Sequence, residues 1–363
     1  MSLADHTASY ELCRYCLMCR HTCPVGRATR REATTPHGWA LMIASADRGQ
    51  LHWDAEAIDT LYQCAQCGLC QSNCVTDQPL PASIAAARAH VVNLGLAPEA
   101  VVALDARLRQ WGNPYQESRP LSAAGSAPCA LFVGAAAQRV HPQTLNAARQ
   151  LLAALGIEYV PVGVGLSSAY LAQALGLRET AQALAKTAMA EIIASGCSRL
   201  IVLTPEDARA FGETLPALGL QLPEGVAVIE LMSLLAAAVE AGQLSFRPVT
   251  GRCTYHDPAH TPHFPGRAAQ ARRVLAALLS QPLHEMFWRE GRAAPGGAVG
   301  GLEFTQPALA ERLARARLAE AAETGAEQLL TEDPAALAHL EPYAAGAKLK
   351  LTGLFELLAE QLA

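Results

Sequence analysis

Eight of the chain's 11 cysteines lie near the N-terminus, in two runs that share the spacing C-x2-C-x2-C-x3-C. The runs contain Cys13, Cys16, Cys19 and Cys23, then Cys64, Cys67, Cys70 and Cys74. Bacterial ferredoxins use this spacing to bind cubane 4Fe–4S clusters through thiolates. The pattern therefore predicts two 4Fe–4S clusters, and with them one-electron transfer.

The fourth cysteine of each run is expected to bind the cluster of the other run, as it does in two-cluster ferredoxins. We assign cluster 1 to Cys13, Cys16, Cys19 and Cys74. We assign cluster 2 to Cys64, Cys67, Cys70 and Cys23. This crossing would tie both runs into one unit and hold the two clusters close together, which fast electron tunnelling requires.

Zinc and disulfides are the alternative fates for these thiols. Structural zinc sites usually pair two C-x2–4-C hooks, and a run of three cysteines plus one is unlike them. Residues 1–12 are polar and acidic with no apolar stretch, so we expect no secretory signal and a reducing compartment. Val75 stands where ferredoxins often have proline, which leaves the ligand assignment unchanged but affects the solvation of the cluster.

Basic side chains crowd the first cysteine run, with Glu32 the nearby acidic residue. They are Arg14, Arg20, His21, Arg27, Arg30 and Arg31. Such a strip could stabilise a reduced cluster and attract an acidic partner. It could equally be a solvated basic face, and the sequence leaves both interpretations open.

The elements that must position the cysteines are predicted to be helices. Apolar spacing and caps indicate helices over 39–46, over 55–62 behind Asp54, from Ser83 to near Gly95, and from Pro98 to Gly112. The cysteines then fall on turns between helices. We expect residues 1–111 to form an α-helical two-cluster ferredoxin-type domain, followed by a linker over 112–128 that is rich in Pro and Gly.

The remainder of the chain alternates short apolar runs with helical segments. Strands are predicted over 129–133, 159–164 and 199–203, and helices over 142–155 and 181–194. Such alternation predicts a parallel α/β sheet. Residues 183–205 resemble residues 310–334, and residues 225–235 resemble residues 346–357. We therefore predict two α/β repeats, 129–247 and 248–363, packed as a pseudo-symmetric pair.

The overall composition excludes some partners. A net charge of −5, a pI near 6.1 and 5% aromatic residues give no reason to expect nucleic-acid binding. No apolar run approaches the roughly 20 residues that span a bilayer, so we expect no direct membrane insertion. We therefore predict a cytoplasmic protein that reaches a membrane only through a partner.

Several local motifs resemble a known family. They are Thr35-Pro-His-Gly38, Leu61-Tyr-Gln-Cys64, Tyr255-His-Asp-Pro258 with His260, and Glu320-Ala-Ala-Glu-Thr-Gly325. With the paired runs they resemble the iron–sulfur subunits of glycolate oxidase and of anaerobic glycerol-3-phosphate dehydrogenase, and heterodisulfide reductases of the C–B type. The resemblance implies a CCG domain in the second half, where heterodisulfide reductases bind a non-cubane cluster through cysteines.

The chain departs from this family wherever the CCG cysteines are expected. Those places hold Val164-Gly165-Leu166, Thr204-Pro205-Glu206-Asp207, Asp257-Pro258-Ala259-His260, Pro295 to Gly301, and Asp333-Pro334-Ala335-Ala336. We therefore predict that the fold is kept, while the extra cluster and disulfide reduction are lost. Cys129, Cys197 and Cys253 lie in or beside apolar strands and are expected to be small buried side chains.

A set of potential metal ligands follows the Tyr255 motif, namely His256, Asp257, His260 and His263. These residue types can bind zinc or iron. The family has the same motif where cysteines bind the metal, so the resemblance favours a structural hydrogen-bonding role for them.

We predict an iron–sulfur electron-transfer subunit that relays single electrons between a flavoprotein dehydrogenase or reductase and a second carrier, within a hetero-oligomer. We find no nucleophile–base pair and no flavin or nicotinamide fingerprint, so no catalytic residue is assigned. One alternative is an iron–sulfur redox sensor. The other is a remodelled metal-dependent site in the second half.

Overall fold

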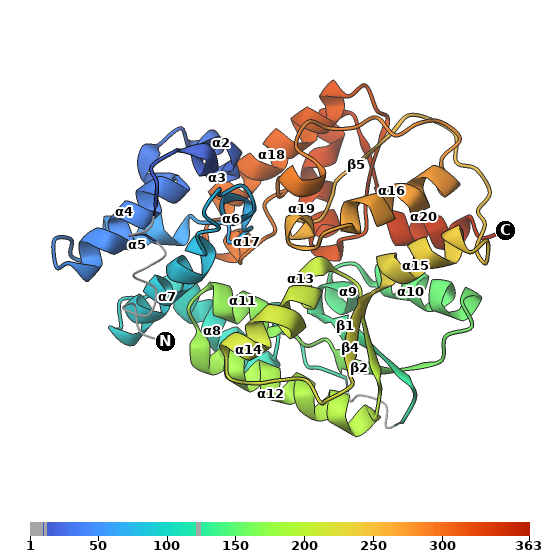
Figure 1. The fold of residues 1–363 in the computed structure, drawn as a ribbon, viewed down its shortest axis with the longest axis horizontal. Coiled ribbons are helices and arrows are strands. Elements are labelled where there is room, and N and C mark those ends of the chain that lie inside the picture. The colour runs from blue at the N-terminus through green and yellow to red at the C-terminus, as the bar shows by residue number, and fades with distance from the viewer. Residues whose placement is uncertain (1–9, 11–12, 121–124) are drawn as a thin grey trace.

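The computed structural model describes residue 10, residues 13–120 and residues 125–363. Figure 1 shows an N-terminal helical part beside two α/β lobes that face each other. The chain is thus a mixed structure of helices and parallel sheets with an N-terminal ferredoxin-type part, as predicted.

The N-terminal part is helical. Its elements are α2 (Met18–Thr22), α3 (Pro24–Thr29), η2 (Glu32–Thr34), α4 (Pro36–Asp47), α5 (Ala55–Tyr62), α6 (Leu69–Ser72), α7 (Leu80–Asn93) and α8 (Glu99–Trp111). Side-chain caps set where two of them begin. Thr35 accepts a hydrogen bond from the backbone N–H of Gly38 at the start of α4, and Asp54 accepts one from Ala57 at the start of α5.

Two details of this part differ from the prediction. Helix α7 begins at Leu80, and Ser83, expected as its cap, is buried inside the helix. The cause is Pro81, which fits the first turn because no backbone N–H is needed there. In addition, Cys19 and Cys70 lie in the short helices α2 and α6 and not on turns.

The start of the predicted linker is firmly held. Asn113 is fully buried, and its side-chain amide donates to the carbonyls of Trp111, Glu117 and Gly165. Residues 121–124 of the linker lie outside the described part of the chain.

The first α/β unit contains a four-stranded parallel sheet with strand order β2-β1-β3-β4. Its elements are β1 (Cys129–Gly134), α9 (Ala135–Arg139), α10 (Pro142–Ala154), β2 (Tyr159–Val164), α11 (Ala169–Ala174), α12 (Arg178–Ser195), β3 (Arg199–Val202), α13 (Pro205–Arg209), η3 (Ala210–Thr214), α14 (Leu215–Ala217), β4 (Ala227–Glu230) and α15 (Leu231–Glu240). The three predicted strands and both predicted helices are present.

The second α/β unit contains a three-stranded parallel sheet with strand order β5-β6-β7. Its elements are β5 (Cys253–Tyr255), η4 (Thr261–His263), α16 (Arg267–Leu278), η5 (Glu290–Arg292), α17 (Leu302–Thr305), α18 (Pro307–Glu323), β6 (Gln328–Thr331), α19 (Pro334–Ala344), η6 (Ala345–Ala347), β7 (Lys350–Gly353) and α20 (Leu354–Glu360).

The two units pack through reciprocal helix pairs. Helix α10 of the first unit contacts α20 of the second, and α15 contacts α16 (Figure 1). Two repeats related by a two-fold axis would pack in this reciprocal way. The pseudo-symmetric relation itself, like the predicted domain boundaries, stays a prediction.

The hydrophobic core does not stop at the helical part. One buried cluster runs from Leu61 and Ile84 through Leu175 of the first unit to Leu302 of the second. Because these side chains share one core, the cysteine loops are held rigidly against both α/β units. Within the described ranges, no helix has the length and apolar character needed to cross a bilayer.

Candidate functional site

The two cysteine runs adopt the same local backbone. The residue before the second cysteine of each run has a positive φ, 53° at Tyr15 and 54° at Gln66. So does the residue after it, with φ of 60° at Leu17 and 77° at Gly68. A short helix, α2 or α6, follows directly. These left-handed residues curl each run into a loop, so one sequence pattern has produced one conformation twice.

The first group of thiols combines three cysteines of run one with the last cysteine of run two. Cys13, Cys16, Cys19 and Cys74 line one cavity together with Leu17 and Met18. Burial raises the pKa of Cys19 to about 11, and the nearby Cys13, Cys74 and Cys16 contribute to that rise. For Cys74, burial also raises the pKa, but hydrogen bonds with Thr76 and Gln78 outweigh it and leave the pKa below its ordinary value.

The second group combines three cysteines of run two with the last cysteine of run one. Burial raises the pKa of all four thiols, to about 12 for Cys67. The thiol of Cys70 is close enough to Cys64, Cys67 and Cys23 for each to raise its pKa, and Cys19 of the first group adds a smaller rise. Cys23 also caps α3, since its sulfur accepts a hydrogen bond from the Gly26 N–H at 3.3 Å.

The residues of both groups fit a 4Fe–4S cluster. Each group offers four thiols, the number of corners that a cube must fill, and each draws them from both runs. The first group lines a cavity, and in the second group backbone N–H donors reach the sulfurs of Cys23 and Cys64. Hydrogen bonds to the sulfurs are one of the features that set the potential of such clusters.

The first group lies at an exposed edge of the molecule. Cys16 is exposed, and the neighbouring Tyr15 and Met18 are 60% and 50% exposed. Part of the basic strip is committed to internal contacts, because Arg20 pairs with Glu32 at 3.0 Å and Arg27 stacks on the Trp288 ring. Arg14 and Arg31 are also exposed, and Arg31 lies 3.7 Å from the exposed carboxylate of Glu56.

The second group is covered by the α/β units. Arg88 is fully buried and donates to the carbonyl of Cys64 at 2.8 Å and to that of Ala174 at 2.7 Å. Tyr170 donates from its hydroxyl to the carbonyl of Gln66 at 2.7 Å. A Cβ on Gly300 would lie 2.6 Å from the carbonyl oxygen of Ala65, so the backbones touch there.

The histidine and aspartate set of the second unit is engaged in hydrogen bonds. His256 accepts a hydrogen bond from Arg317 at 3.0 Å, and the carboxylate of Asp257 accepts two from Arg272 at 2.7 and 2.9 Å. His260 contacts Arg209 at 3.1 Å and His263 contacts the Cys67 carbonyl at 3.3 Å. In the described ranges no three His, Cys, Asp or Glu side chains are arranged to hold a single metal ion.

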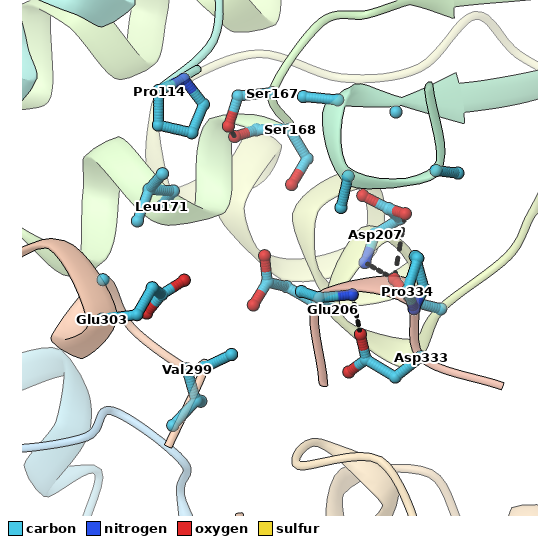
Figure 2. A pocket seen from close by; sticks show the side chains of 18 of the residues that line it. Pro114, Ser167, Ser168, Leu171, Glu206, Asp207, Val299, Glu303, Asp333 and Pro334 are labelled. Atoms are coloured by element: carbon cyan, nitrogen blue, oxygen red, sulfur yellow. Dashed lines mark hydrogen bonds between the residues drawn. The ribbon is translucent and has the colours of Figure 1, made fainter. Parts of the chain in front are cut away.

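Three of the five places where the family has CCG cysteines meet at one cavity of about 80 Å³. Thr204 to Asp207 reach it from the end of β3, Asp333 to Ala335 from the end of β6, and Gly300 and Gly301 from the turn before α17. Figure 2 shows Glu206, Asp207, Glu303 and Asp333 around this cavity. We call it the acidic pocket.

Sequence reasoning missed these four carboxylates as a group. Burial raises the pKa of Glu206, Asp207 and Asp333 to about 7 and that of Glu303 to about 8. Mutual repulsion adds to the effect of burial, for example between Glu206 and Asp207. The available signal was position: Glu206 and Asp333 follow buried parallel strands, whose carboxyl ends commonly border ligand sites.

The three remaining cysteines are buried, as predicted. Cys129 and Cys253 are 2% exposed and begin strands β1 and β5, and Cys197 is 6% exposed just before β3. They belong to the α/β units and not to the two cysteine runs, and they pack as small apolar side chains.

Comparison with protein families defines the class of this protein. A 4Fe-4S dicluster domain matches residues 9–77, and a Cysteine-rich domain, the CCG domain, matches residues 253–341. The latter segment contains one cysteine, Cys253. These two matches support the predicted relationship to iron–sulfur subunits that combine a dicluster domain with a CCG domain, and an electron-transfer type of iron–sulfur protein.

Its curated relatives include one component of dihydromethanophenazine:CoB–CoM heterodisulfide reductase, the subunit designated D, from two organisms. The Methanosarcina barkeri protein is 24% identical over 293 residues, covering 76% of this chain and 71% of its own length. The Methanosarcina acetivorans protein is 25% identical over 292 residues, with the same shares covered. No solved structure matches the chain.

Proposed function

We propose that the chain relays single electrons through two 4Fe–4S clusters, between a flavoprotein partner and a second carrier. The observation that carries this proposal is the grouping of the eight thiols into two sets of four. Cys13, Cys16, Cys19 and Cys74 would hold cluster 1, and Cys64, Cys67, Cys70 and Cys23 would hold cluster 2. Bound there, the clusters supply one-electron redox chemistry, and the chain supplies their spacing and surroundings.

The position of the two groups supports a path from surface to interior. The first group borders the exposed Tyr15 and Met18, with Arg14 and Arg31 nearby, and this face suits docking of an acidic partner. The second group is enclosed by Arg88 and Tyr170, which hold the loop and exclude water. An exposed first cluster site and a shielded second cluster site suit a relay of single electrons.

We further propose that the chain works in a hetero-oligomer without reducing disulfides itself. Its relatives are named as subunits of a heterodisulfide reductase, which supports assembly with other chains. The CCG positions of this chain hold Thr204 to Asp207, Gly300, Gly301 and Asp333 in place of cysteines. Substrate and flavin chemistry would then lie on a partner, with the complex in the cytoplasm.

Anaerobic purification tests the relay directly. We expect about eight irons and eight sulfides per chain, and a coupled two-cluster EPR spectrum on reduction. Co-purification of a flavoprotein would support the relay against a redox sensor. Stoichiometric zinc, iron for one cluster, or the EPR signal of a non-cubane cluster would overturn it.

The docking face has its own test. Arg14→Glu combined with Arg31→Glu should slow electron delivery from the co-purified flavoprotein by about tenfold at low salt, and the defect should shrink as salt screens the charges. Arg149→Glu, on the exposed side of α10, is the matched control and should leave the rate unchanged. Equal rates in all three proteins would place the docking face elsewhere.

A further inference from the structure

One buried nitrogen beside the first group of thiols has no hydrogen-bond partner. The side chain of His37 is 17% exposed and lines the same cavity as Cys13, Cys16, Cys19 and Cys74. Its Nε2 atom is buried and forms no hydrogen bond with any described residue. Buried polar atoms are normally paired, so Nε2 indicates a partner that the described chain does not supply.

The backbone around His37 is fixed from several sides. Thr35 caps α4 by accepting a hydrogen bond from the Gly38 N–H at 3.2 Å. A Cβ on Gly38 would lie 2.3 Å from the carbonyl oxygen of Glu32, so η2 packs directly on the start of α4. The Trp39 indole donates to a backbone carbonyl of α5 at 2.8 Å. Because residues on both sides of His37 are held, its side chain starts from a defined position beside the cavity.

The His37 ring packs against the first cysteine loop. Tyr15, between the first two cysteines of run one, meets this ring edge to face with centroids 5.3 Å apart. The other ring nitrogen, Nδ1, lies 4.0 Å from Oε1 of Glu32, beyond hydrogen-bonding distance, and that carboxylate is paired with Arg20. The tautomer of a neutral imidazole is set by the hydrogen bonds of its nitrogens, so an acceptor in the cavity would place the proton on Nε2.

The chemistry of the cavity suits an Nε2–H donor and not a further ligand. The four cysteines already supply the four thiolates that a 4Fe–4S cluster needs, so no corner is left for the imidazole. The sulfurs of a thiolate-bound cluster are anionic and accept hydrogen bonds. A donor held against them favours the more negative, reduced form, because a hydrogen bond strengthens as the acceptor gains charge.

We infer that His37 donates a hydrogen bond from Nε2 to a sulfur of cluster 1 and thereby raises the reduction potential of that cluster. This inference rests on the proposed function, since it requires a 4Fe–4S cluster at the first group of thiols. One side chain of α4 then adjusts the cluster that lies nearest the exposed edge of the molecule.

A redox titration of the anaerobic full-length protein, followed by EPR, tests the inference. His37→Leu removes the donor and keeps an apolar side chain in its place. Reduction of one of the two clusters should become about tenfold less favourable, a shift of about 59 mV to more negative potential for one electron, while the other cluster changes far less. His52→Leu, at an exposed histidine before α5, is the matched control and should leave both potentials unchanged.

A conservative variant separates the hydrogen bond from packing. His37→Gln places an amide N–H near the position of Nε2 and should restore more than half of the shift. Hyperfine spectroscopy on reduced protein labelled with 15N-histidine should show a weak 15N coupling to a cluster that is absent from His37→Gln. This coupling compares only the wild type and His37→Gln, so it decides the question even if His37→Leu loses its iron.

The failure of this inference is distinguishable from failure of the relay. Two intact clusters with equal potentials in the wild type and His37→Leu would overturn the role of His37 and leave the relay standing. A 15N coupling that is the same in the wild type and His37→Gln would do so too. Iron for fewer than two clusters in the wild type would instead overturn the relay, and the inference with it.

Discussion

The Nε2 atom of His263 lies 3.3 Å from the carbonyl oxygen of Cys67. His263 belongs to η4 of the second α/β unit, and Cys67 to the second cysteine run, so this contact joins the two halves of the chain. Burial lowers the pKa of His263 to about 4, helped by Arg209 and His260. The neutral ring can donate from Nε2 to the carbonyl and hold the loop in place.

This packing predicts that Gly68→Ala damages the second cysteine loop. Gly68 has φ of 77°, and a Cβ there would lie 1.9 Å from Nε2 of His263. The left-handed backbone alone costs an alanine about 1–2 kcal/mol, and the clash must add to that. We expect the variant to lose close to half of its iron, measured by iron and sulfide analysis after anaerobic purification.

Gly95→Ala is the matched control for Gly68→Ala. Gly95 has a similar φ of 71°, but no atom lies within 4 Å of its added Cβ. This variant should keep its iron, and its free energy of unfolding should fall only by the cost of the backbone strain. Adding His263→Ala to Gly68→Ala should restore part of the iron, because the ring that clashes is gone. If the double variant is no better than Gly68→Ala, strain and not the contact with His263 is responsible.

The crossing of the cysteine ligands can be tested with pairs of alanine variants. If Cys13 and Cys74 bind the same cluster, Cys13→Ala with Cys74→Ala should retain about half of the iron. Cys13→Ala with Cys23→Ala should then remove nearly all of it, because one ligand is lost from each cluster. Uncrossed ligands would give the opposite pattern. Cys197→Ala, at a buried cysteine outside both groups, should keep all the iron.

The parts that the sequence predicted well depend on local patterns. The cysteine spacing, the cap Asp54, and the alternation of strands and helices each act within a few residues. The acidic pocket could not be found in this way. Glu206, Glu303 and Asp333 come from segments far apart in the chain, and only the packing of the two units brings their carboxylates together. The start of α7 was predicted wrongly because proline usually breaks a helix, whereas Pro81 lies in the first turn of this one.

The acidic pocket predicts an unusual dependence of stability on pH. Its four carboxylates have folded pKa values of about 7 to 8, above their ordinary values of 3.8 to 4.5. The folded state therefore binds protons more tightly, so these groups favour folding at low pH. Their contribution is complete below about pH 4 and is lost as the pH rises through 7 to 8.

Urea unfolding under anaerobic conditions measures this dependence. Between about pH 5.5 and 7.5, the free energy of unfolding should fall as the pH rises. Glu303→Gln should make this slope shallower by up to about 1.4 kcal/mol per pH unit, which is the value for one proton. Glu206 and Asp333, which repel Glu303 and titrate in the same pH range, remain in both proteins, so the difference reports Glu303 together with its coupling to them. A slope that is unchanged by the substitution would mean that Glu303 ionises normally in the folded state.

Arg267 predicts a different kind of stability effect, at the contact between the two α/β units. Its guanidinium lies 2.8 Å from Glu230 at the end of β4 and 2.5 Å from Glu332 after β6. Tyr255 also donates to Glu332, at 2.8 and 2.9 Å. All four side chains are buried, so neither carboxylate has water to replace the arginine.

Arg267→Met should therefore lower the free energy of unfolding by about 3–5 kcal/mol, because it strands buried carboxylates. The matched control is Arg273→Met in the same helix, which removes an exposed pair with Glu240 and should cost less than about 1 kcal/mol. Adding Glu230→Gln to Arg267→Met should recover part of the loss, since one stranded charge is then neutral. Equal urea midpoints for the two single variants would show that water reaches Arg267 and that the contact between the units opens in solution.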